Sequence, residues 1–264
     1  MLLLLETETY RVEVRYDEFA QNPRTNEASF GHLVCWHHRY RLGDEHSFAE
    51  PRDFLEHLAL ELATEEDVEP FVQRKFGDGV WYDNETDSWF FGEDLYGYED
   101  RESAEQALEK EKEWYRNEEW VQDAKDEELL AVIARHAFVL PVYLYDHSGL
   151  ALSMSRFSCQ WDSGQVGWMY VTHEEILREY GDFHSGVLQL VKSILQEELK
   201  RYEDFINGNV FLFYVENKET KQTAAIGNVY EQDLETIPYL SSDVVPETLF
   251  ESAFWKECVK DLVN

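Results

Sequence analysis

The sequence has little positive charge, few cysteines and no long apolar run. It contains 23 Lys and Arg against 55 Asp and Glu, a formal net charge of −32 over 264 residues. An anionic surface of this kind is repelled by acidic membranes and by nucleic acid. We therefore expect no direct contact with either, and a partner that presents a strongly basic surface.

Cysteines are scarce and far apart. Cys35, Cys159 and Cys258 are odd in number and widely spaced, which predicts free thiols in a reducing compartment and not a disulfide framework. The apolar run Met1–Leu5 meets Glu6 at once, so it lacks the length of a secretory segment. No run approaches the roughly 20 apolar residues that span a bilayer. We expect a cytoplasmic protein.

The chain nevertheless has the composition of a folded protein. Hydrophobic residues make up 44% and aromatic residues 15% of it, whereas a disordered acidic tail is poor in aromatics. We expect the α+β class, with antiparallel sheets, packed helices and an acidic, largely helical middle lobe. Three parts are predicted: an N-terminal α/β part of the core (1–64), an acidic aromatic-rich lobe or insertion (65–137) and a C-terminal α+β core (138–264).

Local patterns predict the individual elements. Alternation of apolar and polar residues, together with turn residues, predicts strands over 9–16, 139–145, 150–154, 166–171, 210–215 and 223–226. Helical spacing predicts helices over 103–119, 126–137, 187–206 and 247–263. Pro51 opens a further helix, with Phe54, Leu55, Leu58 and Leu62 on one face. A capping box at Thr172–Glu175 opens a short helix that Gly181 ends.

The acidic middle is the candidate functional region. Between Trp81 and Leu130 the sequence has 18 acidic and 5 basic residues, a net charge of −13, with ten aromatic residues interleaved. The mixture over Trp81–Tyr98 fits an interface core ringed by charge, and it equally fits a loop that packs into the core.

Glutamates in this region recur at helical spacing. Steps of three, four and four residues place Glu102, Glu105, Glu109 and Glu113 in one stripe of a helix. Like charges at this spacing destabilise a helix, so a cationic partner is one reason to keep them; a solvated face or adaptation to high salt is the other. The apolar side is predicted to consist of Ala104, Ala107, Leu108, Trp114 and Tyr115. Further acids expected to contact the partner are Glu118, Glu119, Asp83, Asp87, Glu93 and Asp94.

Two pairs of motifs resemble a known group of proteins. The first pair is Asn22-Pro23-Arg24 with the stretch Val34–Asp44, and the second is Pro141–Gly149 with Phe157–Gly167. Over residues 8–62 and 138–182 the chain resembles uncharacterised proteins of bacteriophages, plasmids and other mobile elements. This resemblance implies an accessory protein acting in a bacterial host. Accessory proteins of that origin often blunt host defence nucleases, some by imitating DNA.

Two sets of residues suggest chemistry. Cys159 is a candidate nucleophile, with His147 as base and Asp146 or Asp162 as the orienting group. The same residues also fit an ordinary turn and a buried thiol beside Trp161 that holds the β core together. A second set is His32, Cys35, His37 and His38. On a strand Cys35 and His37 share one face and His38 takes the other, so we expect no metal and no cofactor.

These observations favour a non-catalytic inhibitor over an enzyme. We expect a DNA- or RNA-mimicking protein of the anti-CRISPR or anti-restriction type, which occupies a basic nucleic-acid-binding surface of a host defence complex. A thiol-dependent enzyme using Cys159 and His147 is the first alternative. A structural or interaction protein adapted to high salt is the second.

Overall fold

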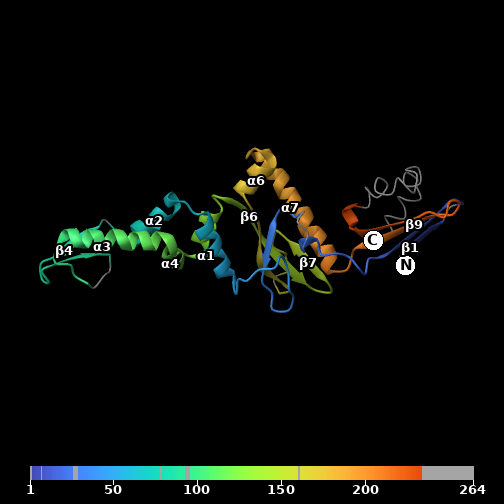
Figure 1. Cartoon of the computed structure of the whole chain (residues 1–264). Helices are drawn as coiled ribbons and strands as arrows, with labels where there is room; N and C mark the ends of the chain where they lie inside the picture. The colour runs from blue at the N-terminus through green and yellow to red at the C-terminus, as the bar shows by residue number, and fades with distance from the viewer. Residues whose placement is uncertain are drawn as a thin grey trace. The chain divides into compact units, whose positions relative to one another are not determined.

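The structure is a computed structural model that describes residues 2–6, 8–25, 29–77, 79–92, 96–159 and 161–233. Helices and antiparallel sheets are both present (Figure 1), so the predicted α+β class is confirmed. The predicted helix over 247–263 lies outside the described residues.

The chain divides into two compact units. The described residues of the first unit fall within 1–33, 141–166 and 185–264, and those of the second within 34–140 and 167–184. These limits differ from the three predicted parts. Residues 34–64 group with the acidic middle because helix α1 (Pro51–Leu62) packs on helices α4 (Trp120–Asp123) and α5 (Asp126–Ile133).

The first unit contains an antiparallel sheet with the strand order β1-β2-β9-β10. Cross-strand pairs join Val12 to Val215 and Val14 to Phe213, and these four buried side chains share one face. Their alternation with polar residues is the period-two pattern that predicted these strands. The strands are β1 (Leu3–Glu6), β2 (Tyr10–Tyr16), β9 (Phe211–Asn217) and β10 (Thr223–Val229).

A second sheet has the order β3-β8-β6-β7, and the limits between the units fall within β3, β6 and β8. The predicted hairpin is confirmed, because Asp146 pairs with Leu150 across the turn. In the second unit Gly167 of β8 approaches β3 so closely that a Cβ atom would lie 1.9 Å from the carbonyl oxygen of Val34. The strands are β3 (His32–Cys35), β6 (Ala137–Asp146), β7 (Leu150–Ser153) and β8 (Ser163–Thr172).

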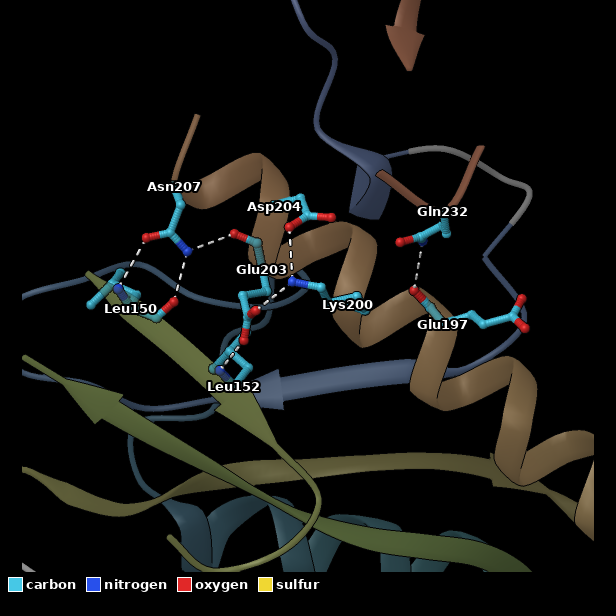
Figure 2. A network of polar contacts seen from close by, with 8 residues as sticks. All are labelled: Leu150, Leu152, Glu197, Lys200, Glu203, Asp204, Asn207 and Gln232. Atoms are coloured by element: carbon cyan, nitrogen blue, oxygen red, sulfur yellow. Dashed lines mark hydrogen bonds and ion pairs between the residues drawn. The ribbon is translucent and has the colours of Figure 1, made fainter. Parts of the chain in front are cut away.

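Helix α7 (Ser185–Ile206) covers the free edge of β7 with polar side chains (Figure 2). The Asn207 amide accepts from Leu150 N at 3.0 Å and donates to Leu150 O at 2.7 Å. Glu203 accepts from Leu152 N at 2.6 Å and also pairs with Lys200 at 2.9 Å. The exposed edge of a strand can pair with a strand of another chain. Here the side chains of Asn207 and Glu203 already form hydrogen bonds with the backbone groups that such pairing would use.

The second unit is built around a core of helices. Phe54, Leu55 and Leu58 of α1 are buried, as the spacing predicted, and Phe71 of α2 (Glu65–Phe76) meets the buried Trp120 with ring centroids 4.9 Å apart. A two-stranded hairpin packs on helix α3. The remaining elements of this unit are β4 (Val80–Asp83), β5 (Ser88–Phe91), α3 (Arg101–Trp114), a π-helical segment (Tyr115–Glu119) and α6 (His173–Tyr180).

Two predicted helices have different limits in the structure. The helix expected over 103–119 is α helical only to Trp114 and continues as a π-helical segment into α4. The helix expected over 126–137 ends at Ile133, and Ala137 already belongs to β6. The turn between α5 and β6 is held by Asp67, a tertiary contact that local spacing does not reveal. By contrast, the predicted capping box of α6 and its left-handed Gly181 are confirmed.

Asp67 is a buried carboxylate with four donors. It accepts from Thr64 N at 2.9 Å and Thr64 Oγ1 at 2.7 Å, from Arg135 at 2.7 Å and from His136 at 2.6 Å. Burial alone would raise the pKa of this carboxyl, but the donors, led by Thr64, outweigh it and lower the pKa well below its usual range. Asp67 thereby ties the start of α2 to the turn before β6.

We predict that Asp67→Asn lowers the free energy of unfolding at pH 7 by about 1.5–3 kcal/mol, the range for hydrogen bonds to a charged group. A carboxyl whose pKa is lowered by folding stabilises above its unfolded pKa, near 4, and that contribution is lost as the pH falls further. Urea denaturation at pH 7 and pH 3 should therefore show a smaller difference between variant and natural protein at pH 3. Glu66→Gln, an exposed neighbour, controls for the loss of one charge. An equal effect at both pH values would contradict the assignment.

Candidate acidic partner-binding surface

Helix α3 carries the predicted glutamate stripe on an exposed face. Glu102, Glu105, Glu109 and Glu113 are all exposed. Asp100 is the N-cap of the helix: its carboxylate accepts from Ser103 N at 2.8 Å, and the Ser103 hydrogen bonds lower the pKa of Asp100. This carboxylate satisfies one of the donors that a helix start leaves open. The stripe is therefore set on a well-defined helix start.

The opposite side of α3 packs as predicted, with one exception. Ala104, Leu108 and Tyr115 are buried and Ala107 is half-buried, but Trp114 is 46% exposed. The expectation that Trp114 packs in the core was wrong. Trp114 is the last residue of the regular α-helix, and at 100° per residue it lies about 80° from Ala104 and 120° from Leu108, at the margin of the apolar face.

The stripe is only partly neutralised within its own helix. Arg101 pairs with Glu105 at 2.7 Å and Lys112 with Glu109 at 3.2 Å. Glu102 accepts from the Gln106 amide at 3.4 Å. Within the described residues Glu113 makes no ion pair. Exposed pairs of this kind contribute little to stability and exchange readily with other partners, so these carboxylates remain open to an external cation.

The other predicted acids have mixed surroundings. Glu118 is exposed and Glu119 half-buried in the π-helical segment. Asp83 accepts from Thr86 Oγ1 at 2.7 Å and from Glu85 N at 3.1 Å, and these bonds, led by that from Thr86, lower its pKa. Asp87 accepts from the Tyr82 hydroxyl. Asp83 and Asp87 thus shape the β4–β5 turn, whereas Glu93 and Asp94 lie outside the described residues.

Exposed aromatic rings accompany these acids. Trp81 is 51% exposed and Tyr96 is 79% exposed, while Phe91 of the same segment is buried. The Trp81 ring stacks on Phe90 with centroids 5.0 Å apart. In the described part of 81–98, some residues pack inward and others present large exposed rings, a residue type that is enriched at protein interfaces.

Some residues of the predicted thiol site lie close together in the structure. In the first unit Asp162 Oδ2 lies 3.5 Å from His147 Nδ1 and 3.9 Å from Cys159 Sγ. The backbone also joins Asp146 N to Asp162 O at 2.9 Å. A thiol activated by a histidine needs direct contact between those two side chains. Here the carboxylate of Asp162 contacts both, and no contact between His147 and Cys159 is found in the described part of the chain.

The prediction that Cys159 is buried beside Trp161 in the β core is wrong. Its side chain is 96% exposed, and Cys159 is half-buried. The structure therefore does not support a buried thiol packed beside Trp161. The reason is that the chain from Met154 to Asp162 belongs to no strand or helix among the described residues, so alternation with the strands on either side does not extend through it.

The four residues considered as metal ligands, His32, Cys35, His37 and His38, do not form a common site. Cys35 is buried and its carbonyl oxygen contacts His46 Nε2 at 3.0 Å, while the His37 ring stacks on Tyr40. Within residues that the structure describes, no three His, Cys, Asp or Glu side chains converge as a metal site. In the same residues, no helix is both long enough and apolar enough to cross a membrane.

Comparison of the chain with protein-family models, with curated proteins and with solved structures finds no match to any of them. The functional argument therefore depends on the residues of this chain alone. Sequence reasoning missed one set of residues, the cations Arg74, Lys75 and Lys110, which line a cavity together. They come from two helices, and no motif of adjacent residues marks them.

Proposed function

We propose that this protein is a non-catalytic acidic inhibitor that occupies the basic nucleic-acid-binding surface of a host defence complex, such as a CRISPR effector or a restriction enzyme. The exposed and only partly neutralised carboxylates of α3 carry the proposal. They lie in a segment with a net charge of −13, and such a surface complements a channel built to hold phosphates.

The spacing of the stripe supports mimicry of a nucleic acid. Steps of three and four residues along a helix separate the carboxylates by roughly 4.5–6 Å along its axis. Duplex DNA carries about one charge per 1.7 Å of axis, so the stripe matches part of that density. The buried Ala104 and Leu108 hold the helix against its unit, and a pre-organised row of charges costs less to order on binding.

Exposed rings provide the apolar part of such an interface. Trp114 follows Glu113 directly, and Trp81 belongs to the hairpin that packs on α3 (Figure 1). Buried tryptophan and tyrosine anchors carry much of the binding energy in protein interfaces, while charges set specificity and the rate of association. The combination fits a protein partner better than a purely electrostatic contact does.

We predict that reversing Glu102, Glu105, Glu109 and Glu113 to Lys abolishes partner binding and leaves the fold intact. Thermal stability should hold or rise, since self-repulsion falls. Melting curves and nuclease-inhibition or plaque assays on the same variant test both statements. A matched control reverses four other exposed acids and changes the total charge equally: Glu18, Glu45, Glu66 and Glu179. Full inhibition by the α3 variant, or equal loss in the control, would show that the stripe is not the binding surface.

A second prediction concerns salt. The protein should compete with DNA or guide RNA for the nuclease, and its affinity should fall steeply between about 50 and 200 mM salt. Binding measured by competition across that range tests this. Affinity independent of salt, or direct binding of the protein to duplex DNA, would contradict mimicry. A protein adapted to high salt instead loses its fold in dilute buffer, which a melting curve at 50 mM salt reveals.

The thiol-dependent enzyme remains the second candidate, favoured by the contacts of Asp162 with both His147 and Cys159. The inhibitor proposal predicts that Cys159→Ser retains full biological activity, because no covalent step is involved. Plaque or nuclease assays on that variant decide between the two, with His147→Gln as its companion. Loss of activity in both variants with unchanged melting would favour the enzyme.

A further inference from the structure

The second unit contains a cavity of about 410 Å³ between α1, α2 and the π-helical segment that follows α3. It is a different cavity from the one that Lys110 lines. Three apolar side chains form part of its wall: Leu60 near the end of α1, Val68 of α2 and Trp120 at the start of α4. Val68 and Trp120 are buried, whereas Leu60 is 39% exposed. The wall therefore includes apolar surface that a side chain entering from solvent can contact at Leu60.

Charged side chains from two different helices form another part of the wall. Glu65 is the first residue of α2, and Glu113 is the last glutamate of the stripe on α3. Both are exposed, and neither makes an ion pair within the described residues. Arg116 also lines the cavity, but its guanidinium pairs with Glu69 at 3.0 Å. The two lining carboxylates are therefore left without a cation of their own, and the lining is negative, as is the surface around it.

Glu65 has a second reason to be acidic, because it lies in the first turn of α2. Glu65, Glu66 and Asp67 are all there, and carboxylates at a helix start are stabilised by the helix dipole. Glu66 shares this place in the helix but is not part of the cavity lining. A comparison of Glu65 with Glu66 therefore separates a role in the cavity from stabilisation of the helix.

A side chain with an apolar stem and a cationic head matches this combination. Arginine and lysine lay their methylene stems along apolar surface while their heads stay among polar groups. A guanidinium group is more weakly hydrated than an ammonium group and has five N–H donors, so it can serve carboxylates from two helices. Asn117 adds an amide oxygen to the lining as a further acceptor. Arginine is also enriched among the residues that contribute most to binding in protein interfaces.

We propose that this cavity receives an arginine side chain of the partner protein. The stem packs on Leu60 and Trp120, and the guanidinium pairs with Glu65 and Glu113. The identity of the partner rests on the proposed function, since a surface that holds nucleic acid presents arginine and lysine to phosphates. The cavity adds a specific anchor at one end of the glutamate stripe, whose attraction for cations is otherwise independent of their shape.

Binding of N-acetyl-arginine amide to the full chain tests the site without a nuclease. In a nuclear magnetic resonance titration at 150 mM salt, this probe should shift the backbone amide signals of Thr64 and Asn117, which both line the cavity. N-acetyl-citrulline amide has nearly the same shape without the charge and should leave both signals unchanged. N-acetyl-lysine amide should bind more weakly than the arginine probe. No shift with arginine, or equal binding of either comparison compound, would overturn the assignment.

Variants locate the site and give effects of opposite sign. Glu65→Gln should weaken binding of the arginine probe about twofold to fivefold, the range for an exposed ion pair, whereas Glu66→Gln should bind like the natural protein. Arg116→Gln should strengthen binding, because it removes a like charge from the lining; a purely structural role would weaken it. Melting curves confirm that the variants fold. Equal affinities of Glu65→Gln and Glu66→Gln would overturn the proposal.

Nuclease-inhibition assays separate this proposal from the inhibitor function. Glu65 does not belong to the stripe on α3, and Glu65→Gln should weaken inhibition while Glu66→Gln does not. If the protein inhibits no nuclease but binds the arginine probe with this selectivity, the proposed function fails and the cavity assignment stands. If reversal of the stripe abolishes inhibition while Glu65→Gln inhibits like Glu66→Gln, the inhibitor function stands and the cavity assignment is wrong.

Discussion

The constraint on which the rest of the structure depends is the mutual repulsion of 55 carboxylates with only 23 basic side chains to offset them. Such an excess destabilises a compact chain, so a buried acid needs compensating donors. Asp67 has four of them, and Glu13 is held between Arg11 and Arg15 on its strand. Asp204 has the fewest: it pairs with Lys200 while its Oδ2 has no partner among the described residues, and burial raises the pKa of this carboxyl. Most of the other described carboxylates lie at least partly in solvent, where repulsion is screened.

Two arginine side chains hold neighbouring segments together by hydrogen bonds and ion pairs. Arg52 of α1 bonds to Glu56, Asp126 and the carbonyl oxygens of Val121 and Ala124, and so fixes the junction of α4 and α5. In the first unit Arg24, from the Asn-Pro-Arg motif, is buried against Glu198 and the Gly31 carbonyl. A planar guanidinium group can bind several acceptors at once because it presents several donors in fixed directions. The motif residue Arg24 thus has a clear structural task.

Helix α3 shows how one element separates different surfaces. One side, with Ala104 and Leu108, is buried; another carries the four glutamates; a third, with Lys110, lines the cavity. A straight helix keeps these sides apart because each residue turns by a fixed angle. The same helix therefore keeps its packed side, its exposed carboxylates and the cavity-lining side that carries Lys110 apart.

Much of the fold could be predicted from the sequence. Period-two alternation located β2, β6 and β9, and the capping box with Gly181 located α6, because these signals depend on residues close together in the chain. The outward face of α3 followed from its spacing for the same reason. The glutamate stripe was therefore the part of the candidate site accessible to sequence reasoning.

What only the tertiary structure decided depends on contacts between distant residues. The end of α5 is determined by Asp67, nearly seventy residues away in the chain. Trp114 is exposed at the margin of the packed face of α3, and Trp161 is exposed in an irregular loop. The cavity between α2 and α3 needs Arg74 and Lys75 beside Lys110, and the contact of Asp162 with His147 needs a closed hairpin. The sequence by itself determined which surfaces are charged and where regular elements form; packing decided which side chains meet, because proximity across the fold is not encoded in any short run of residues.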